Sequence, residues 1–106
     1  MKDMMGMMRQ ARDMQNKMQE AQARLDSVEV TGRSGGGAVE VTLTGKGEAK
    51  RVVISPELFT EDDKAVLEDL VVAAFNDARG KSEEEAQKVM QDAMGPLAGL
   101  GAMFGQ

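Results

Sequence analysis

The chain has 106 residues, a net charge of −5, and neither cysteine nor histidine. The lack of cysteine excludes disulfides and thiol nucleophiles, and the lack of histidine removes the commonest general base and metal ligand. A chain of this length forms one small domain, and its three aromatic residues give it only a modest core. No apolar run approaches the roughly 20 residues of a membrane span or forms a signal peptide. We therefore expect a cytoplasmic protein that completes its core by pairing with a second copy.

Charge is unevenly distributed along the chain. Residues 1–54 hold nine Lys and Arg against seven Asp and Glu, whereas residues 55–106 hold four against eleven. Phosphate contacts dominate the affinity of proteins for nucleic acids. The acidic balance therefore argues against nucleic-acid binding unless the first half presents a local basic face.

The first 28 residues carry the pattern of an amphipathic helix. Apolar residues recur at alternating steps of three and four and form a seam: Met4, Met7, Ala11, Met14, Met18, Ala21, Leu25 and Val28. Good helix formers fill the positions between them. We expect a long helix over about residues 7–26, with Gly6 fraying its first turn and with Met14 and Met18 packed against a neighbouring helix.

The apolar period then changes to two, which is typical of strands. Two alternating strands flank the glycine-rich loop 34–37, and a third is expected over about residues 48–55. The inward residues would be Val28, Val30, Val39, Val41, Leu43, Val52 and Ile54. A strand, not a helix, follows the loop, so we interpret it as a hairpin turn and not as a phosphate-binding loop.

A second long helix follows this antiparallel meander. A turn should bring Leu58 and Phe59 onto the core, and Thr60 should cap the helix together with the carboxylates that follow it. The helix is expected to bury Val66, Leu67, Leu70, Val71, Ala74, Phe75 and Ala78.

Gly80 interrupts the second helix, and Ser82 begins what resembles a new capping box. The helix either restarts at Ser82 or continues past Gly80 at a cost of about 1 kcal/mol, and we favour continuation. The fold class is then α+β: a long N-terminal helix, a three-stranded antiparallel meander and a long C-terminal helix. We expect a single domain over residues 1–94, with a Met-rich arm at 1–8 and a flexible glycine-rich tail at 95–106.

Particular residues in these elements carry a resemblance to a known family: Val30-Thr31-Gly32, Ser34 to Gly37, Val39, Val41-Thr42, Gly45, Val52, Ile54, Pro56, Leu58 and the run from Leu67 to Ala78. In order and spacing the set resembles the YbaB/EbfC family of bacterial nucleoid-associated proteins, over roughly residues 14–79. The resemblance implies a tweezer-like homodimer whose strands join into one sheet and whose long helices project as arms. It also implies binding of duplex DNA with little sequence preference, bending or bridging of that DNA in the nucleoid, and an influence on gene expression.

Basic side chains of the two helices are the candidate DNA contacts. Arg9, Arg12 and Asn16 lie on the face opposite the seam, Lys17 and Arg24 flank the seam, and Arg79, Lys81 and Lys88 lie where the second helix leaves the core. On charge alone these residues would form a solvated face, and it is the resemblance that favours phosphate contacts. Stacking on single-stranded bases is not expected, because no aromatic residue is interleaved with them.

The methionines leave a second interpretation open. Seven of the ten lie in the first 18 residues, and residues 4–8 could dock partner helices in a dimeric protein-interaction module. Thioethers also suit Cu(I), although a copper site is not our expectation. The carboxylates Glu68, Asp69, Asp77 and those of residues 61–63 are interpreted as solvated helix positions. We expect no enzymatic activity, no cofactor, no metal, no membrane contact and no small-molecule substrate.

Overall fold

The computed structural model describes residues 2–95, so the tail expected from residue 95 onward lies, apart from its first residue, outside the described residues. The elements run in the order helix, three strands, helix, with a short 3-10 turn inside the first hairpin and another before the last helix. They are α1 (Lys2–Ser27), β1 (Glu29–Ser34), η1 (Gly35–Gly37), β2 (Val39–Thr44), β3 (Ala49–Ile54), η2 (Pro56–Leu58) and α2 (Lys64–Met94). The strands form one antiparallel sheet in the order β1-β2-β3. This confirms the α+β meander.

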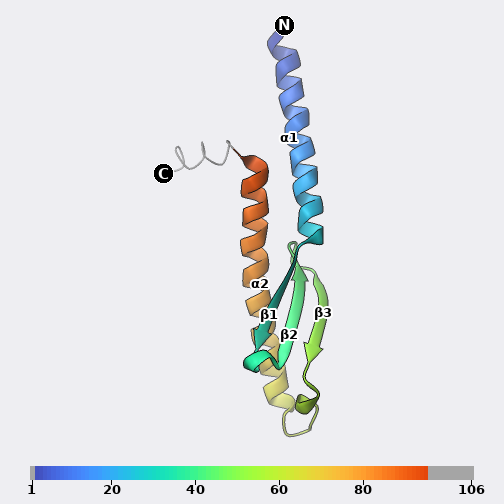
Figure 1. Ribbon diagram of the computed structural model, residues 1–106, viewed down its shortest axis with the longest axis vertical. Coiled ribbons are helices and arrows are strands. Elements are labelled where there is room, and N and C mark those ends of the chain that lie inside the picture. Colours follow the sequence, from blue (N-terminus) through green and yellow to red (C-terminus); the bar gives the residue numbers. More distant parts are fainter. Residues whose placement is uncertain (1, 96–106) are drawn as a thin grey trace, which may run out of the picture.

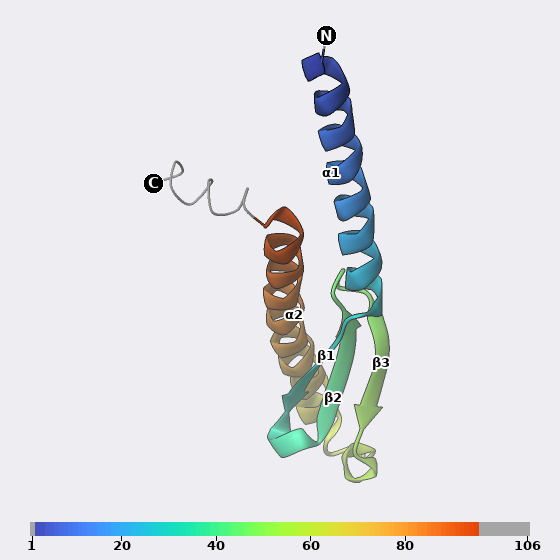
Figure 2. The same cartoon turned by 45° about the horizontal axis from the view of Figure 1, so that its top comes forward.

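The molecule is long and thin, with extents of 74 × 29 × 15 Å. α2 crosses one face of the sheet and continues past its end beside α1, which runs in the opposite direction (Figure 1). The start of α1 projects beyond the end of α2, as the turned view also shows (Figure 2). Within the described residues, no helix has the length and apolar character needed to cross a membrane.

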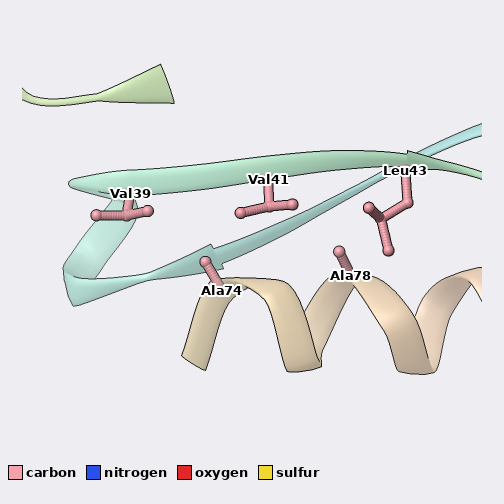
Figure 3. Packing of buried hydrophobic residues seen from close by; sticks show 5 residues of the cluster. All are labelled: Val39, Val41, Leu43, Ala74 and Ala78. Atoms are coloured by element: carbon pink, nitrogen blue, oxygen red, sulfur yellow. The ribbon is translucent and has the colours of Figure 1, made fainter. Parts of the chain in front are cut away.

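The main core lies between β2 and the middle of α2. Val39, Val41 and Leu43 point from the strand onto Ala74 and Ala78 of the helix, and all five are buried (Figure 3). The small alanine side chains let α2 come so close that β1 has no room for a side chain at Gly32. A Cβ built on Gly32 would clash with the backbone nitrogen of Ala78 and the carbonyl oxygen of Ala74. The close crossing of helix and sheet therefore depends on glycine at this position.

A second, smaller core joins the two helices. Ala21 and Leu25 of α1 are buried against Val89 of α2. Two turns before Val89 on α2, the buried hydroxyl of Ser82 donates a 2.7 Å hydrogen bond to the carbonyl of Thr44 at the end of β2. Ser82 is thus an interior residue of one unbroken helix, and the expected continuation of α2 through Gly80 is confirmed.

Both helix starts differ from the expectation. α1 begins at Lys2, not near residue 7, because the good helix formers around Gly6 carry the helix through it, and a Cβ at that glycine would meet no atom within 4 Å. α2 begins at Lys64. The hydroxyl of Thr60 accepts a 3.1 Å hydrogen bond from the Asp63 backbone N–H. Thr60 therefore closes a turn over residues 60–63, directly before α2, and does not cap the helix itself.

Four residues expected in the core are exposed, and α2, which lies against β1 and β2, leaves β3 uncovered. Val52 of β3 is 48% exposed and Phe75 of α2 is 39% exposed. Phe59 and Val66, near the start of α2, are also exposed. Of the remaining residues expected to be buried in α2, Ala74 and Ala78 are buried and Leu67, Leu70 and Val71 are half-buried.

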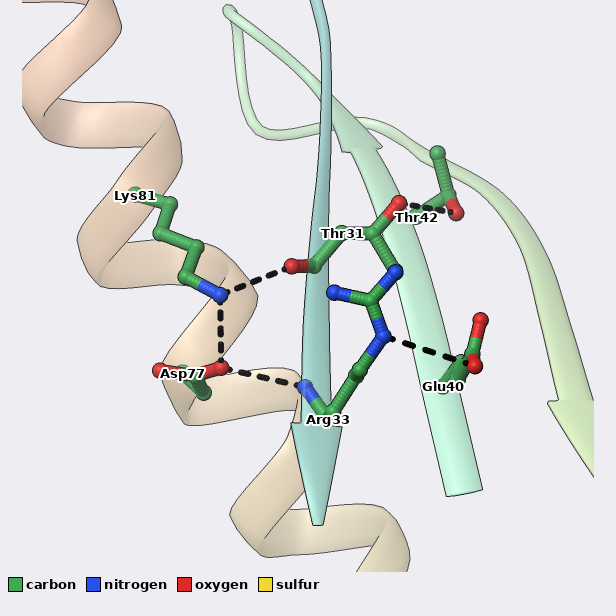
Figure 4. A network of polar contacts seen from close by, with 6 residues as sticks. All are labelled: Thr31, Arg33, Glu40, Thr42, Asp77 and Lys81. Carbon is green, nitrogen blue, oxygen red and sulfur yellow. Dashed lines mark hydrogen bonds and ion pairs between the residues drawn. The ribbon is translucent and has the colours of Figure 1, made fainter. Parts of the chain in front are cut away.

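Side chains of α2 close the outer edge of β1. Asp77 Oδ2 accepts a 3.0 Å hydrogen bond from the Arg33 backbone N–H, and Lys81 Nζ donates a 3.0 Å hydrogen bond to the Thr31 carbonyl (Figure 4). The two side chains also form an ion pair of 3.1 Å. The hydrogen bond from Arg33, together with the one from Lys81, lowers the pKa of Asp77 below its usual value of 3.8. Asp77 is exposed, as expected of a solvated helix position, and it also holds the edge of β1 against α2.

Candidate nucleic-acid interface

The first turns of α1 present an exposed basic face. Arg9 and Arg12 lie one turn apart, and with Met5 and Met8 they border a shallow hollow of about 200 Å³. Asn16 is exposed one turn further along. Neither arginine forms an ion pair with any of residues 2–95. Their charge is therefore available to an external anion.

The candidate residues nearer the sheet face the space between the helices. Lys17 and Arg24 line a hollow of about 360 Å³ together with Glu20 of α1 and Asp92 of α2. Arg24 Nη2 lies 3.7 Å from Asp92 Oδ2. Lys17 makes no ion pair within the described part of the chain. The structure thus brings Arg24 to an acidic partner on α2 and leaves Lys17 without one.

The three candidate basic residues of α2, Arg79, Lys81 and Lys88, are all paired with carboxylates. Arg79 lies 3.3 Å from Glu83 and Lys88 lies 3.5 Å from Glu85, in each case one turn along the same exposed helix face. Exposed pairs of this kind stabilise a protein by only about 0–1 kcal/mol, so a phosphate could displace either carboxylate at small cost. Lys81 differs, because it also holds the backbone of β1 and does not sit where the helix leaves the core.

The sequence pattern places Met5 and Met8 in the Met-rich arm but does not predict that they border the basic face. Met5 and Met8 share the face of Arg9 and Arg12, while Met4 and Met7 belong to the opposite seam. The steps of three and four from Met5 through Met8 to Arg12 are the signal that could have separated the two groups. In residues 2–95 no group of three or more acidic side chains is placed to hold a metal ion.

Comparison with known proteins identifies relatives of this fold. A sequence profile of the YbaB/EbfC DNA-binding family matches residues 1–97. The chain belongs to this family. A nucleoid-associated protein of Maricaulis maris is 52% identical over 97 residues, which cover 92% of this chain and 91% of the relative. One of Agrobacterium fabrum is 49% identical over 92 residues, which cover 87% and 86%.

The fold also matches a solved structure. The crystal structure of an uncharacterized protein from Helicobacter pylori has a TM-score of 0.68 at 26% identity, and the match covers 77% of this chain and 86% of that one. The resemblance read from residues 14–79 is therefore confirmed, and it extends further at both ends than expected. YbaB/EbfC is a DNA-binding family and not a class of enzymes, so DNA is the partner class that membership of the family supports.

Proposed function

We propose that this YbaB/EbfC protein binds duplex DNA as a homodimer in the nucleoid, gripping phosphates with basic side chains of its projecting helices. Binding of this kind carries little sequence preference, because phosphate contacts do not read the bases. We propose further that the protein bends or bridges the DNA and so influences gene expression. The observation that carries the proposal is the exposed position of Arg9 and Arg12 on a helix that extends past the rest of the fold.

The length of α1 keeps Arg9 and Arg12 away from the acidic groups of α2. Asp92, the last acidic residue of α2, pairs with Arg24, and Arg12 lies twelve residues before Arg24, which is about 18 Å of helix at 1.5 Å per residue. The screening length at 0.1 M salt is roughly 10 Å. Arg9 and Arg12 therefore feel little of the negative charge on α2, and a polyanion can approach them from the end of the arm.

The eight candidate residues should contribute unequally to the affinity for DNA. Arg9, Arg12 and Lys17 have no carboxylate partner among residues 2–95, and Asn16 adds a neutral donor between them. Arg24, Arg79 and Lys88 must first give up a carboxylate, and Lys81 must also release the β1 backbone. We propose that the first group supplies most of the affinity and that Lys81 supplies the least.

The open edge of the sheet supports pairing of two copies at β3. The β1 edge is closed by Asp77 and Lys81, whereas β3 has only β2 beside it in the described chain. Val52 and Val53 of β3 are 48% and 54% exposed. An edge strand with exposed valines on both faces is a template for pairing. Joining two β3 strands would give one continuous sheet with an arm at each end.

Replacement of Arg9, Arg12 and Lys17 together with Ala tests the arm. The dimer would lose six cations, so the slope of log affinity against log salt should fall in magnitude by up to about 5. The matched control replaces Arg33, Lys46 and Lys64 with Ala, which changes the net charge equally but leaves α1 and the β3 edge intact. An equal loss of slope in both variants would show that net charge and not the arm governs binding.

The dimer interface has its own test. Val53→Asp should convert the dimer to a monomer in light scattering, because a charge would be buried at the joined edge. Val66→Asp is the control, since Val66 is 48% exposed but lies on α2. A dimer that survives Val53→Asp, or that is lost equally in Val66→Asp, would remove β3 from the interface.

One observation favours a second function. Met4, Met5, Met7 and Met8 are between 64% and 71% exposed, and such adaptable apolar surfaces suit the docking of partner helices. Deletion of residues 2–8 separates the two functions. Loss of a bound protein partner with DNA affinity retained would support an interaction module, and loss of DNA affinity would support the arm as a DNA element.

A further inference from the structure

Met5 of α1 is a large apolar side chain that the fold leaves bare. It is 71% exposed, more than any other large apolar residue among those the structure describes. It lies on the part of α1 that projects beyond the end of α2 (Figures 1 and 2). Packing within the described fold therefore does not account for a methionine at this position.

Met5 continues the stripe of basic and polar side chains on α1. Steps of four, three and four lead from residue 5 to Arg9, Arg12 and Asn16. At 3.6 residues per turn, these four side chains lie within about 60° of one another around the helix axis. Met5 also borders the same hollow as Arg9 and Arg12. Met7, which is 66% exposed, belongs to the seam on the other side of the helix, about 160° away.

A duplex held by this stripe meets Met5 as well as the arginines. Arg9 and Arg12 reach phosphates, which form the polar outside of the duplex, and a thioether gains nothing there. The stacked bases inside a groove are the apolar surface that DNA offers. Methionine is one of the side chains that proteins insert between base steps from the minor groove, which unstacks the step and kinks the duplex by about 20–90°. Such a wedge needs no hydrogen bond to a base edge, so it suits binding with little sequence preference.

We propose that Met5 wedges between two base pairs beside the phosphates that Arg9 and Arg12 hold, and that this wedge bends the duplex. The inference rests on the proposed DNA binding and goes beyond it, because it assigns the bending to one side chain. Each copy in the proposed dimer carries one such wedge. Bridging of two duplexes would need no contact of this kind.

Energy transfer between dyes at the two ends of a short duplex measures the bend at saturating protein. We expect wild type to raise the transfer and Met5→Ala to lose about half of that rise or more, whereas Met5→Leu should keep it because leucine is also a wedge side chain. Met7→Ala is the matched control, since it removes an almost equally exposed methionine from the same arm and should bend DNA as wild type does. Alanine and leucine are good helix formers, so the arm stays helical in every variant.

Salt dependence and altered DNA distinguish a wedge from other contacts. Met5→Ala removes no charge, so the slope of log affinity against log salt should equal that of wild type. A mismatched base pair costs less to unstack, so wild type should bind a duplex with one mismatch about fivefold more tightly than the matched duplex, and Met5→Ala should lose this gain. Replacement of thymine by uracil removes only the methyl group in the major groove and should not change the affinity of either protein.

Three results would overturn the wedge while leaving DNA binding intact. They are a duplex that stays straight at saturation, equal bending by wild type and Met5→Ala, and an equal loss of bending in Met5→Ala and Met7→Ala. Weaker binding of wild type to the uracil duplex would also overturn it, because Met5 would then lie against thymine methyl groups. A wild-type protein with no affinity for any duplex would instead overturn the proposed function, and the wedge with it.

Discussion

Gly32→Ala should destabilise the fold more than any other single added methyl group in the described chain. A Cβ at this position would lie 2.7 Å from Ala78 Cα and closer still to two other backbone atoms of α2. Backbone atoms cannot rotate away as a side chain can, so β1 and α2 must separate. That separation would loosen the packing of Val41 and Leu43 on the helix.

The expected loss is about 3 kcal/mol, at the upper end of the cost of overpacking a well-packed core. Backbone strain does not contribute, because Gly32 is not among the glycines with positive φ. The matched control is Gly80→Ala, which adds the same methyl group inside α2 where no atom lies within 4 Å. It should stabilise the helix by about 1 kcal/mol through propensity alone.

Urea unfolding followed by circular dichroism at a fixed protein concentration measures both variants, since the chain has no Trp or Tyr for fluorescence. A fixed concentration matters because the proposed dimer would gain stability as the protein concentration rises. The reasoning would be refuted if Gly32→Ala changed the free energy of unfolding by less than about 0.5 kcal/mol, the range of an unremarkable surface substitution.

Two further substitutions test contacts made by α2. Ionised Asp77 stabilises the fold because its pKa is lowered below 3.8, so its contribution is present above that pH and is lost as the pH falls through the lowered pKa. Asp77→Asn should therefore lower the urea midpoint at pH 7, and the difference from wild type should shrink below pH 3.8; a constant difference would contradict this. Ser82→Ala should cost about 1–2 kcal/mol because it removes a buried hydrogen bond to Thr44, whereas Ser27→Ala, whose hydrogen bond is exposed, should cost less than about 0.5 kcal/mol; equal losses in urea unfolding would argue against burial as the cause.

Periodicity in the sequence was sufficient for the elements and their faces, but not for which faces are covered. Val39, Val41 and Leu43 alternate and are buried as expected. Val52 and Phe75 also occupy inward positions, yet they are exposed because α2 does not extend over β3. A sequence pattern indicates which side of an element is apolar. Whether that side is buried depends on where another element lies, and a second copy of the chain can also bury it.

In the candidate site, too, some contacts can be predicted from the sequence and others depend on tertiary packing. That Arg79 and Lys81 would find carboxylates could be read from spacing, since Glu83 and Asp77 lie four residues away on the same helix. The pairing of Arg24 with Asp92 could not, because it depends on the antiparallel packing of two helices distant in sequence. The contact of Lys81 with the Thr31 carbonyl is equally tertiary.

Fluorescence anisotropy of a labelled duplex, titrated with the wild-type protein over a series of salt concentrations, tests the central claim most directly. Light scattering of the same sample gives the size of the protein. The account predicts a dimer whose affinity falls steeply as salt rises and changes little between unrelated DNA sequences. A dimer with no affinity for DNA even at low salt, or with affinity that is independent of salt, would contradict the proposal that its helices grip phosphate.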